Sequence, residues 1–287
     1  MLLECVPNIS EGRSAAVLDR CVEAIQTAGA RVIHRTSDPV HNRSVLTVVG
    51  DRSDVARAAL ELARVTVETI DLRVHAGVHP RIGALDVLPF VPLGDASMAD
   101  AVAAARECAA RIWEELRVPT FLYGEAAVTP LRRNLAAVRQ GQFEGLDARF
   151  ELPDWRPDFG DIAKHVSAGA IAVGARGILI AFNVELATGD LRIARRIAGA
   201  LRGRDGGLRS LKALGLRLGS DVVQVSFNVT EYRATPLYRI VELVRAYAAA
   251  EGVAVLRSEL IGCIPFQAVR ETAEYYLGIA PKSGASV

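Results

Sequence analysis

Two kinds of apolar pattern alternate along the first part of the chain. They read LLECV (residues 2–6), RSAAVLDRCVEAIQTA (13–28), RVIH (31–34), SVLTVV (44–49), SDVARAALELARVTVET (53–69) and LDVLPFV (85–91). The short runs are typical of strands, whereas the two long segments repeat apolar residues with the 3.6-residue period of a helix. The predicted order is therefore strand, helix, strand, strand, helix, strand.

Further patterns extend this order and then repeat it. Residues 97–116 are predicted to form a helix with Ser97 as its N-cap, and Pro119 separates it from a strand at 120–123. The second half has a helix with Thr235 as cap, Pro236 at the first helical position and Gly252 past its end. Its predicted elements are strands at 178–183, 214–218, 222–229 and 253–262, and helices at 189–201 and 235–250.

The repeated order predicts an α+β protein of two ferredoxin-like (βαββαβ) subdomains with helices outside and mainly antiparallel sheets that face each other. We place the subdomains at residues 1–175 and 176–287. Residues 124–175 are rich in Gly and Pro and are predicted to form a long loop with one or two short helices. Long irregular segments are usually functional or disordered, and the aromatic residues here favour function.

Composition narrows the class of partner. The 287 residues carry 34 basic and 33 acidic side chains, so nothing favours binding to nucleic acid or to an anionic membrane. Three basic residues are lysines and the other 31 are arginines, which reflects either a genomic or thermal bias or the use of some planar guanidinium groups to bind carboxylates. The four cysteines form no CxxC motif, the N-terminal residues do not resemble a signal peptide, and Arg176 interrupts the apolar run 166–182. We expect a cytoplasmic protein.

Four of the five histidines lie between residues 34 and 79. The spacing of His75 and His79 fits a zinc pair on a helix, but Gly77 and Pro80 disfavour a helix there, and no metal is expected. We interpret His79 as a general base, because neutral imidazole accepts a proton near pH 7. A chance cluster of structural histidines is the alternative.

Polar residues accompany this cluster. Asp38-Pro-Val-His-Asn-Arg43 lies at the predicted turn between two strands, where it has a site role or serves only the turn. Arg81 follows His79 closely and is a candidate for binding a carboxylate. The glycines of 167–177 lack the GxGxxG order and precede a strand, which argues against a dinucleotide-binding loop.

Ordered blocks over nearly the whole chain resemble the formiminotransferase domain of glutamate formiminotransferase. They are ECVPNISEG (4–12), DPVHNRSV (38–45), HPRIGALDV (79–87), LYGEA (122–126), PDFG (157–160), GAR (174–176), IAFN (180–183), QVSFN (224–228) and SELIG (258–262).

The resemblance implies transfer of a formimino group from N-formimino-L-glutamate to N5 of tetrahydrofolate in histidine degradation, with His79 as general base. Asp38 and Arg81 are expected to join His79 in catalysis. Asn42, Arg43 and Asp86 are expected to bind substrate. The family's folate-binding segment matches Gly160, Asp161, Ile162, Ala163, Lys164, His165, Val166, Ser167, Ala168 and Gly169. Tetrahydrofolate is then a co-substrate.

The chain also departs from the family pattern. Thr36 stands where mammalian relatives have an aspartate, Val78 where glutamate is common, and residues 164–167 differ in the folate loop. Two alternatives stay open: the same fold with a formyl donor such as N-formylglutamate, or a folate-binding protein without catalysis. The family's mammalian members are dimers fused to a cyclodeaminase, so we expect a homodimer and a separate cyclodeaminase as a candidate partner.

Overall fold

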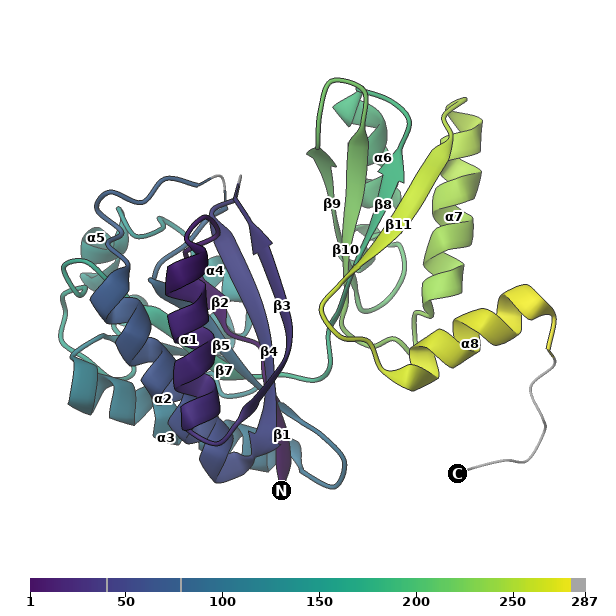
Figure 1. Ribbon diagram of the computed structural model, residues 1–287. Coiled ribbons are helices and arrows are strands. Elements are labelled where there is room, and N and C mark those ends of the chain that lie inside the picture. The colour runs from purple at the N-terminus through teal and green to yellow at the C-terminus, as the bar shows by residue number, and fades with distance from the viewer. Residues whose placement is uncertain (40, 78, 280–287) are drawn as a thin grey trace. The chain divides into compact units, whose positions relative to one another are not determined.

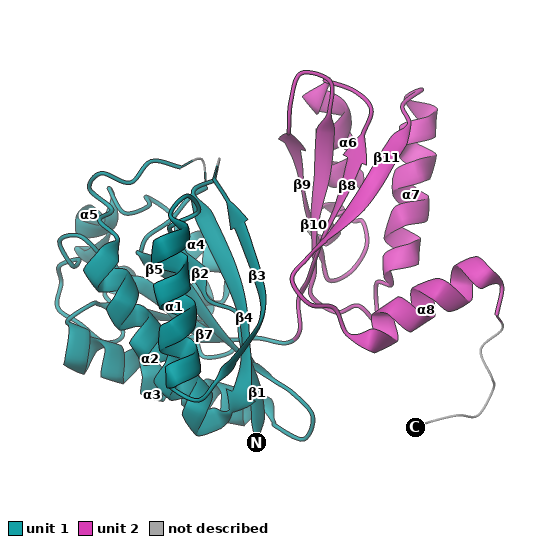
Figure 2. Cartoon of the chain, viewed as in Figure 1, with its two compact units in different colours: residues 1–177 teal, residues 178–287 magenta. Residues whose placement is uncertain are grey.

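The chain folds into two compact units, residues 1–177 and 178–287 (Figure 2). This computed structural model describes residues 1–39, 41–77 and 79–279. Each unit combines helices with its own β-sheet (Figure 1), which confirms the predicted α+β class.

Unit 1 is built around a seven-stranded mixed sheet. In space its strands run β3, β4, the pair β1 and β2, β5, β7 and β6, with β5–β7 and β6–β7 parallel and the other pairings antiparallel. The strands are β1 (Leu2–Cys5), β2 (Asn8–Ile9), β3 (Arg31–Asp38), β4 (Arg43–Asp51), β5 (Leu85–Pro92), β6 (Thr120–Gly124) and β7 (Ile171–Ala175).

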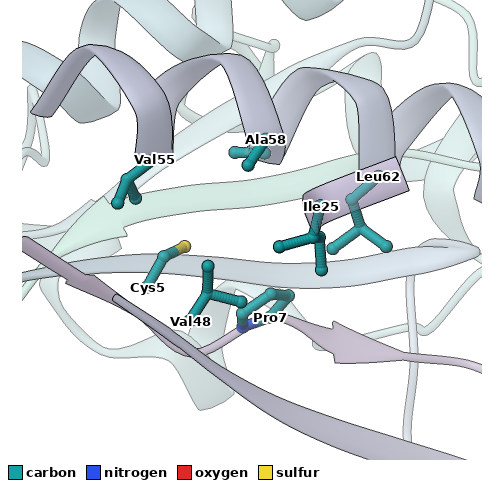
Figure 3. Close-up of a pocket in the computed structure, with 8 residues that line it drawn as sticks. Cys5, Pro7, Ile25, Val48, Val55, Ala58 and Leu62 are labelled. Atoms are coloured by element: carbon teal, nitrogen blue, oxygen red, sulfur yellow. The ribbon is translucent and has the colours of Figure 1, made fainter. Parts of the chain in front are cut away.

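Three long helices pack side by side in unit 1 (Figure 1): α1 (Ala15–Thr27), α2 (Arg52–Thr69) and α3 (Met98–Leu116). Ser97 caps α3 as predicted, because its hydroxyl and the Asp100 carboxylate form a reciprocal capping box. Figure 3 shows a narrow packing gap between α2, α1 and the sheet, lined by Cys5, Pro7, Ile25, Val48, Val55, Ala58, Ala59 and Leu62. All of these side chains except Pro7 belong to the hydrophobic core of the unit.

The segment 124–175 contains more structure than predicted. It has two short α-helices, α4 (Leu135–Val138) and α5 (Leu146–Phe150), and two single 3₁₀ turns, η1 (Pro130–Arg133) and η2 (Pro153–Trp155). The loop prediction is wrong at its end, where β7 pairs with β5 and β6. A strand between two parallel neighbours is buried on both faces, so its residues form an apolar run without the alternation that marks an exposed strand.

Unit 2 has a four-stranded antiparallel sheet in the order β11, β8, β10, β9 (Figure 1). Its elements are β8 (Ile180–Leu186), α6 (Leu191–Leu201), η3 (Gly203–Asp205), β9 (Leu211–Arg217), β10 (Val223–Val229), α7 (Leu237–Ala250), β11 (Val255–Ile261) and α8 (Phe266–Leu277). Pro236, not Thr235, is the N-cap of α7, since the Thr235 hydroxyl donates to the carbonyl oxygen of Arg209. Helix α8 is not among the elements that the sequence pattern predicts.

The cysteines differ between the units. Cys5, Cys21 and Cys108 are buried in unit 1, and burial raises the pKa of each thiol, to about 12 for Cys21 and Cys108. Cys263 in unit 2 is exposed. Among the described residues, no helix is long and apolar enough to cross a membrane.

Candidate functional site

The turn between β3 and β4 holds the first predicted site residues. Both carboxylate oxygens of Asp38 face His41, one accepting from its backbone N–H at 2.9 Å and the other lying 2.6 Å from its Nδ1. Asn42 is in the left-handed region (φ 48°), its Oδ1 accepts from the N–H of Gly12 and its Nδ2 donates to the carbonyl of Ala76. The Asn42 side chain therefore ties three segments together, although it is a predicted substrate ligand.

His79 lies beside this turn. The ring centroids of His79 and His41 are 6.3 Å apart in an edge-to-face arrangement. Nδ1 of His79 is 2.7 Å from the carbonyl oxygen of Pro80. A carbonyl only accepts hydrogen bonds, so Nδ1 carries the proton and Nε2 carries the lone pair in the neutral ring.

Burial, followed by the positive charges of Arg43 and Arg139, lowers the pKa of His79 from 6.5 to about 4. The carbonyl of Pro80 and the carboxylate of Asp86 oppose this shift. The imidazole is therefore neutral at pH 7, as a proton acceptor must be. The neighbouring residue Val78 lies outside the described residues, so its departure from the family pattern stays a sequence observation.

Asp86 forms the charged centre of the site. Its side chain is fully buried, and it accepts from Nη1 of Arg43 at 2.9 Å, Nη2 of Arg139 at 2.6 Å and the N–H of Ile82 at 2.8 Å. The pairing of β2 with β5 shifts register between Asn8 and Ile9, which leaves Asp86 as the extra residue of a β-bulge. A bulge redirects a side chain, and such irregularities are common next to active sites.

Charge attraction keeps Asp86 ionised. Burial raises the pKa of Asp86, but Arg139 and Arg43 outweigh it, and the pKa falls below its ordinary value. Burial likewise lowers the pKa of Arg43 to about 10. Arg43 also donates to Oδ1 of Asn8 at 2.8 Å. Two of the three predicted substrate-binding residues, Arg43 and Asp86, thus contact each other directly.

Arg81 has a different partner. Its Nη1 and Nη2 contact the two carboxylate oxygens of Glu144 at 2.9 and 2.8 Å in a bidentate pair. Its Nε contacts Nδ1 of His75 at 3.4 Å, and Nε2 of His75 lies 3.2 Å from the carbonyl of Asn42. The fork of Arg81 that was predicted to hold a substrate carboxylate therefore holds Glu144, whose side chain is 63% exposed.

The predicted folate segment, residues 160–169, is anchored close to these groups. Gly169 bridges both His165 and Gly83, and the N–H of Ala84 donates to the carbonyl of Ala168 at 2.9 Å. Gly169 has φ +73°, and a Cβ there would collide with the carbonyl oxygen of Ile82. Val166 is 67% exposed. The segment thus joins the backbone at 82–84, directly before Asp86.

Three site residues escaped the sequence reasoning: Arg139, Glu144 and Asn8. Arg139 lies directly after α4, 53 residues from Asp86 in the chain. No local pattern separates it from the other arginines. The block ECVPNISEG, which includes Asn8, was the one signal that marked any of them. Thr36, in the position of the mammalian aspartate, donates its hydroxyl to the carbonyl of Val45 at 3.5 Å.

The next point is whether the described residues include a set of side chains that could bind a metal ion. Within residues 1–39, 41–77 and 79–279, no group of three or more His, Cys, Asp or Glu side chains is arranged to hold a metal ion. His75 and His79 do not form a helical i, i+4 pair, because residues 70–84 contain no helix in the part that the structure describes, as Gly77 and Pro80 led us to expect.

Comparison with known proteins identifies the family. The family described as "Formiminotransferase domain, N-terminal subdomain" matches residues 2–176, and "Formiminotransferase domain" matches residues 181–283. A glutamate formimidoyltransferase of Streptococcus pyogenes serotype M1 is 44% identical over 280 residues, covering 97% of this chain and 94% of that protein.

Two further relatives agree. A glutamate formimidoyltransferase of Thermoplasma acidophilum is 45% identical over 280 residues and covers 96% of this chain and 92% of that protein. The formimidoyltransferase-cyclodeaminase of Rattus norvegicus is 40% identical over 282 residues, which cover 96% of this chain but 52% of the relative. The chain belongs to the formiminotransferase family.

Proposed function

We propose that the protein is a glutamate formimidoyltransferase that moves the formimino group of N-formimino-L-glutamate to N5 of tetrahydrofolate, in histidine degradation. The family membership supports the activity. The observation that carries the mechanism is His79, a neutral imidazole whose Nδ1 faces the carbonyl of Pro80 and whose Nε2 has its lone pair available.

In the proposed reaction one bond forms, one bond breaks, and His79 carries the proton between the two nitrogens. N5 of tetrahydrofolate attacks the amidine carbon, and Nε2 of His79 takes the proton that N5 loses. The tetrahedral intermediate then breaks the bond to the glutamate nitrogen, and His79 returns the proton to that nitrogen. The products are 5-formimidoyltetrahydrofolate and L-glutamate. No covalent enzyme intermediate is needed, since alignment of the two substrates supplies much of the rate.

The other predicted residues have supporting roles in this proposal. Asp38 faces the same region as His79 through His41 and supplies negative charge for the cationic amidine. Arg81 forms a bidentate ion pair with Glu144 and so fixes the position of Glu144 in the site. Asn42, Arg43 and Asp86 shape the donor pocket. Residues 160–169 bind the folate.

Finer points of architecture belong to the same proposal. The strand orders β5-β1-β4-β3 in unit 1 and β11-β8-β10-β9 in unit 2 support two ferredoxin-like subdomains, at 1–175 and 176–287, with β6 and β7 added to the first. The facing sheets, the homodimer, the cytoplasmic location and the separate cyclodeaminase partner stay predictions. Size measurement in solution tests the dimer.

A coupled assay tests the function. Purified protein is incubated with N-formimino-L-glutamate and tetrahydrofolate, and the methenyl-folate formed on acidification is followed by its absorbance. We expect turnover with the formimino donor and far less with N-formylglutamate. Faster transfer from the formyl donor, or tight folate binding in calorimetry without turnover on either donor, contradicts the proposal.

A further inference from the structure

The charges around Asp86 do not balance. Two buried guanidiniums, with side chains 8% exposed in Arg43 and 15% exposed in Arg139, share the single carboxylate of Asp86. The remaining acceptor on Arg43 is the neutral amide oxygen of Asn8. Because burial of an unmatched charge is costly, this cluster, with one net positive charge, favours the arrival of an anion.

Neighbouring charged groups do not supply that anion. Glu144 is engaged with Arg81, and Asp38 with His41. Glu4 lies close enough to Arg176 for that arginine to oppose the rise in pKa that burial causes in Glu4. The excess charge thus belongs to the pair Arg43 and Arg139.

Arg139 also has unused donors. Of its guanidinium nitrogens only Nη2 donates to a protein group in the described part of the chain, and Nε is buried without an acceptor. The contrast is Arg132, another buried arginine in the same segment, whose Nε, Nη1 and Nη2 all donate, to Asp158 and to the carbonyls of Asp154 and Arg156. A buried donor without a partner needs an explanation. Nε of Arg149 is also buried without a partner, but its Nη1 and Nη2 both donate to backbone carbonyls. Arg139 differs because, in the described part of the chain, Nη1 has no acceptor either, and this donor lies beside an excess of positive charge.

We propose that Arg139, held by Asp86 beside His79, binds a carboxylate of the amino-acid donor. The proposal deepens the proposed function and rests on it, since it names the subsite that fixes the glutamate end of N-formimino-L-glutamate. A carboxylate there satisfies the open donors of Arg139 and neutralises the cluster. It also offsets the positive charge that lowers the pKa of His79, so donor binding makes the base stronger when it is needed.

Substitution of Arg139 tests the subsite. Arg139→Gln removes the charge and Arg139→Lys keeps it without the fork. Arg133→Gln is the matched control, because Arg133 lies in the same segment, its side chain is 66% exposed, and its one ion pair among the described residues is a 4.0 Å contact with Glu125. Steady-state kinetics give KM for donor and for tetrahydrofolate, and calorimetry measures binding of L-glutamate directly. Circular dichroism confirms that each variant is folded.

We expect Arg139→Gln to raise KM for the donor and to weaken L-glutamate binding by about 10- to 100-fold, the usual worth of a charge-assisted hydrogen bond. Arg139→Lys loses less, and KM for tetrahydrofolate changes little in either variant. Arg133→Gln behaves as the unmodified protein. If neither Arg139 variant folds, a second measurement uses the unmodified protein. Its affinity for L-glutamate is compared with its affinity for glutaramide, which lacks the carboxylates, and this comparison decides whether carboxylates are recognised.

The outcomes separate the two proposals. Turnover in the unmodified protein with an unchanged donor KM in Arg139→Gln overturns the subsite and leaves the activity intact. A shift in the pH profile alone, without loss of L-glutamate binding, also overturns it, because Arg139 then acts only through His79. L-glutamate binding that depends on Arg139, in a protein without formimino transfer, supports the subsite and rejects the proposed reaction.

Discussion

The two units share a strand plan but differ in chemistry. Four strands of unit 1 and the four strands of unit 2 follow the same spatial order, yet all five histidines lie in unit 1. Unit 1 also has β6, β7 and the segment between them, which contributes Arg139 and Glu144 to the site. The segment added to the shared strand order therefore supplies two of the six charged side chains of the site, and Asp38, Arg43, Arg81 and Asp86 come from the rest of unit 1.

Ion pairs differ between the units in the same way. Asp86 in unit 1 is inaccessible to solvent and has two arginine partners. Arg196 and Glu251 in unit 2 form a bidentate pair with both side chains open to water. Water screens the second pair and not the first. Removal of one partner should therefore cost more at Asp86 than at the Arg196–Glu251 pair.

The largest effect is expected from His79→Ala, which removes the proposed base. Turnover should fall by about 10²- to 10⁴-fold while the protein stays folded. The control is His34→Ala, which alters a histidine of β3 whose side chain forms no hydrogen bond or ion pair with the groups around Asp86 in the described part of the chain. An undiminished rate in His79→Ala would show that the chemistry is not centred on this histidine.

The next largest effect is expected from Asp86→Asn, and it is a loss of protein stability. Loss of the carboxylate leaves two buried arginines without a counter-charge, and we expect the free energy of unfolding to fall by about 3–5 kcal/mol in urea titration. Arg196→Gln is the matched change in unit 2 and should leave the unfolding midpoint unchanged. Equal effects from the two substitutions would contradict the contrast between the units.

The low pKa of Asp86 gives this prediction a pH dependence. The folded-state pKa is below the unfolded value, so the stabilisation is present above the unfolded pKa and is lost as pH falls through the folded one. The gap in stability between the unmodified protein and Asp86→Asn should therefore narrow in acid.

The pKa of His79 tests whether the buried charges of unit 1 act on the proposed base. Its ring should titrate with a pKa of about 4 in an NMR pH series, because of burial and of the two arginines. The folded state thus favours the neutral ring, and the associated stability is present above the ordinary pKa of 6.5 and is lost as pH falls toward 4. Arg139→Gln should raise the midpoint. A midpoint that stays near 6.5 would mean that the charge cluster does not act on the base.

A smaller effect is expected from Gly169→Ala. Both Gly169 in unit 1 and Gly252 in unit 2 have positive φ, +73° and +69°. An alanine Cβ at 169 meets the carbonyl of Ile82, whereas one at 252 meets nothing within 4 Å. Gly252→Ala should therefore cost about 1–2 kcal/mol, the strain of the left-handed backbone alone. Gly169→Ala should cost more and should weaken folate binding in calorimetry, and equal costs would argue against a tightly held folate segment.

Most helices and strands were predicted correctly, because the patterns that mark them depend on residues close together in the sequence. The 3.6-residue period and the Ser97 cap locate α3, and alternation locates most strands. They failed for β7, which is buried between parallel neighbours. They failed for α8 as well, whose exposed residues include Phe266 and Tyr275, so its apolar stripe is not confined to one buried face.

The residues of the candidate site also fall into two groups: those that lie in a sequence motif and those that only tertiary packing brings to the site. Motif blocks located His79, Asp38 and Arg43, since each lies within an unusual run of residues. The partners that set their chemistry come from far along the chain: Arg139 reaches Asp86 across 53 residues and Glu144 reaches Arg81 across 63. Such pairs depend on tertiary packing, which no spacing in a single sequence encodes.

The placement of the cysteines gives each unit its own reactivity toward electrophiles. Thiol reagents attack the thiolate, and the buried Cys5, Cys21 and Cys108 resist both access and ionisation. Cys263 is exposed at the end of β11. A maleimide dye applied to the native protein should therefore label unit 2 selectively, which gives this unit an optical label of its own.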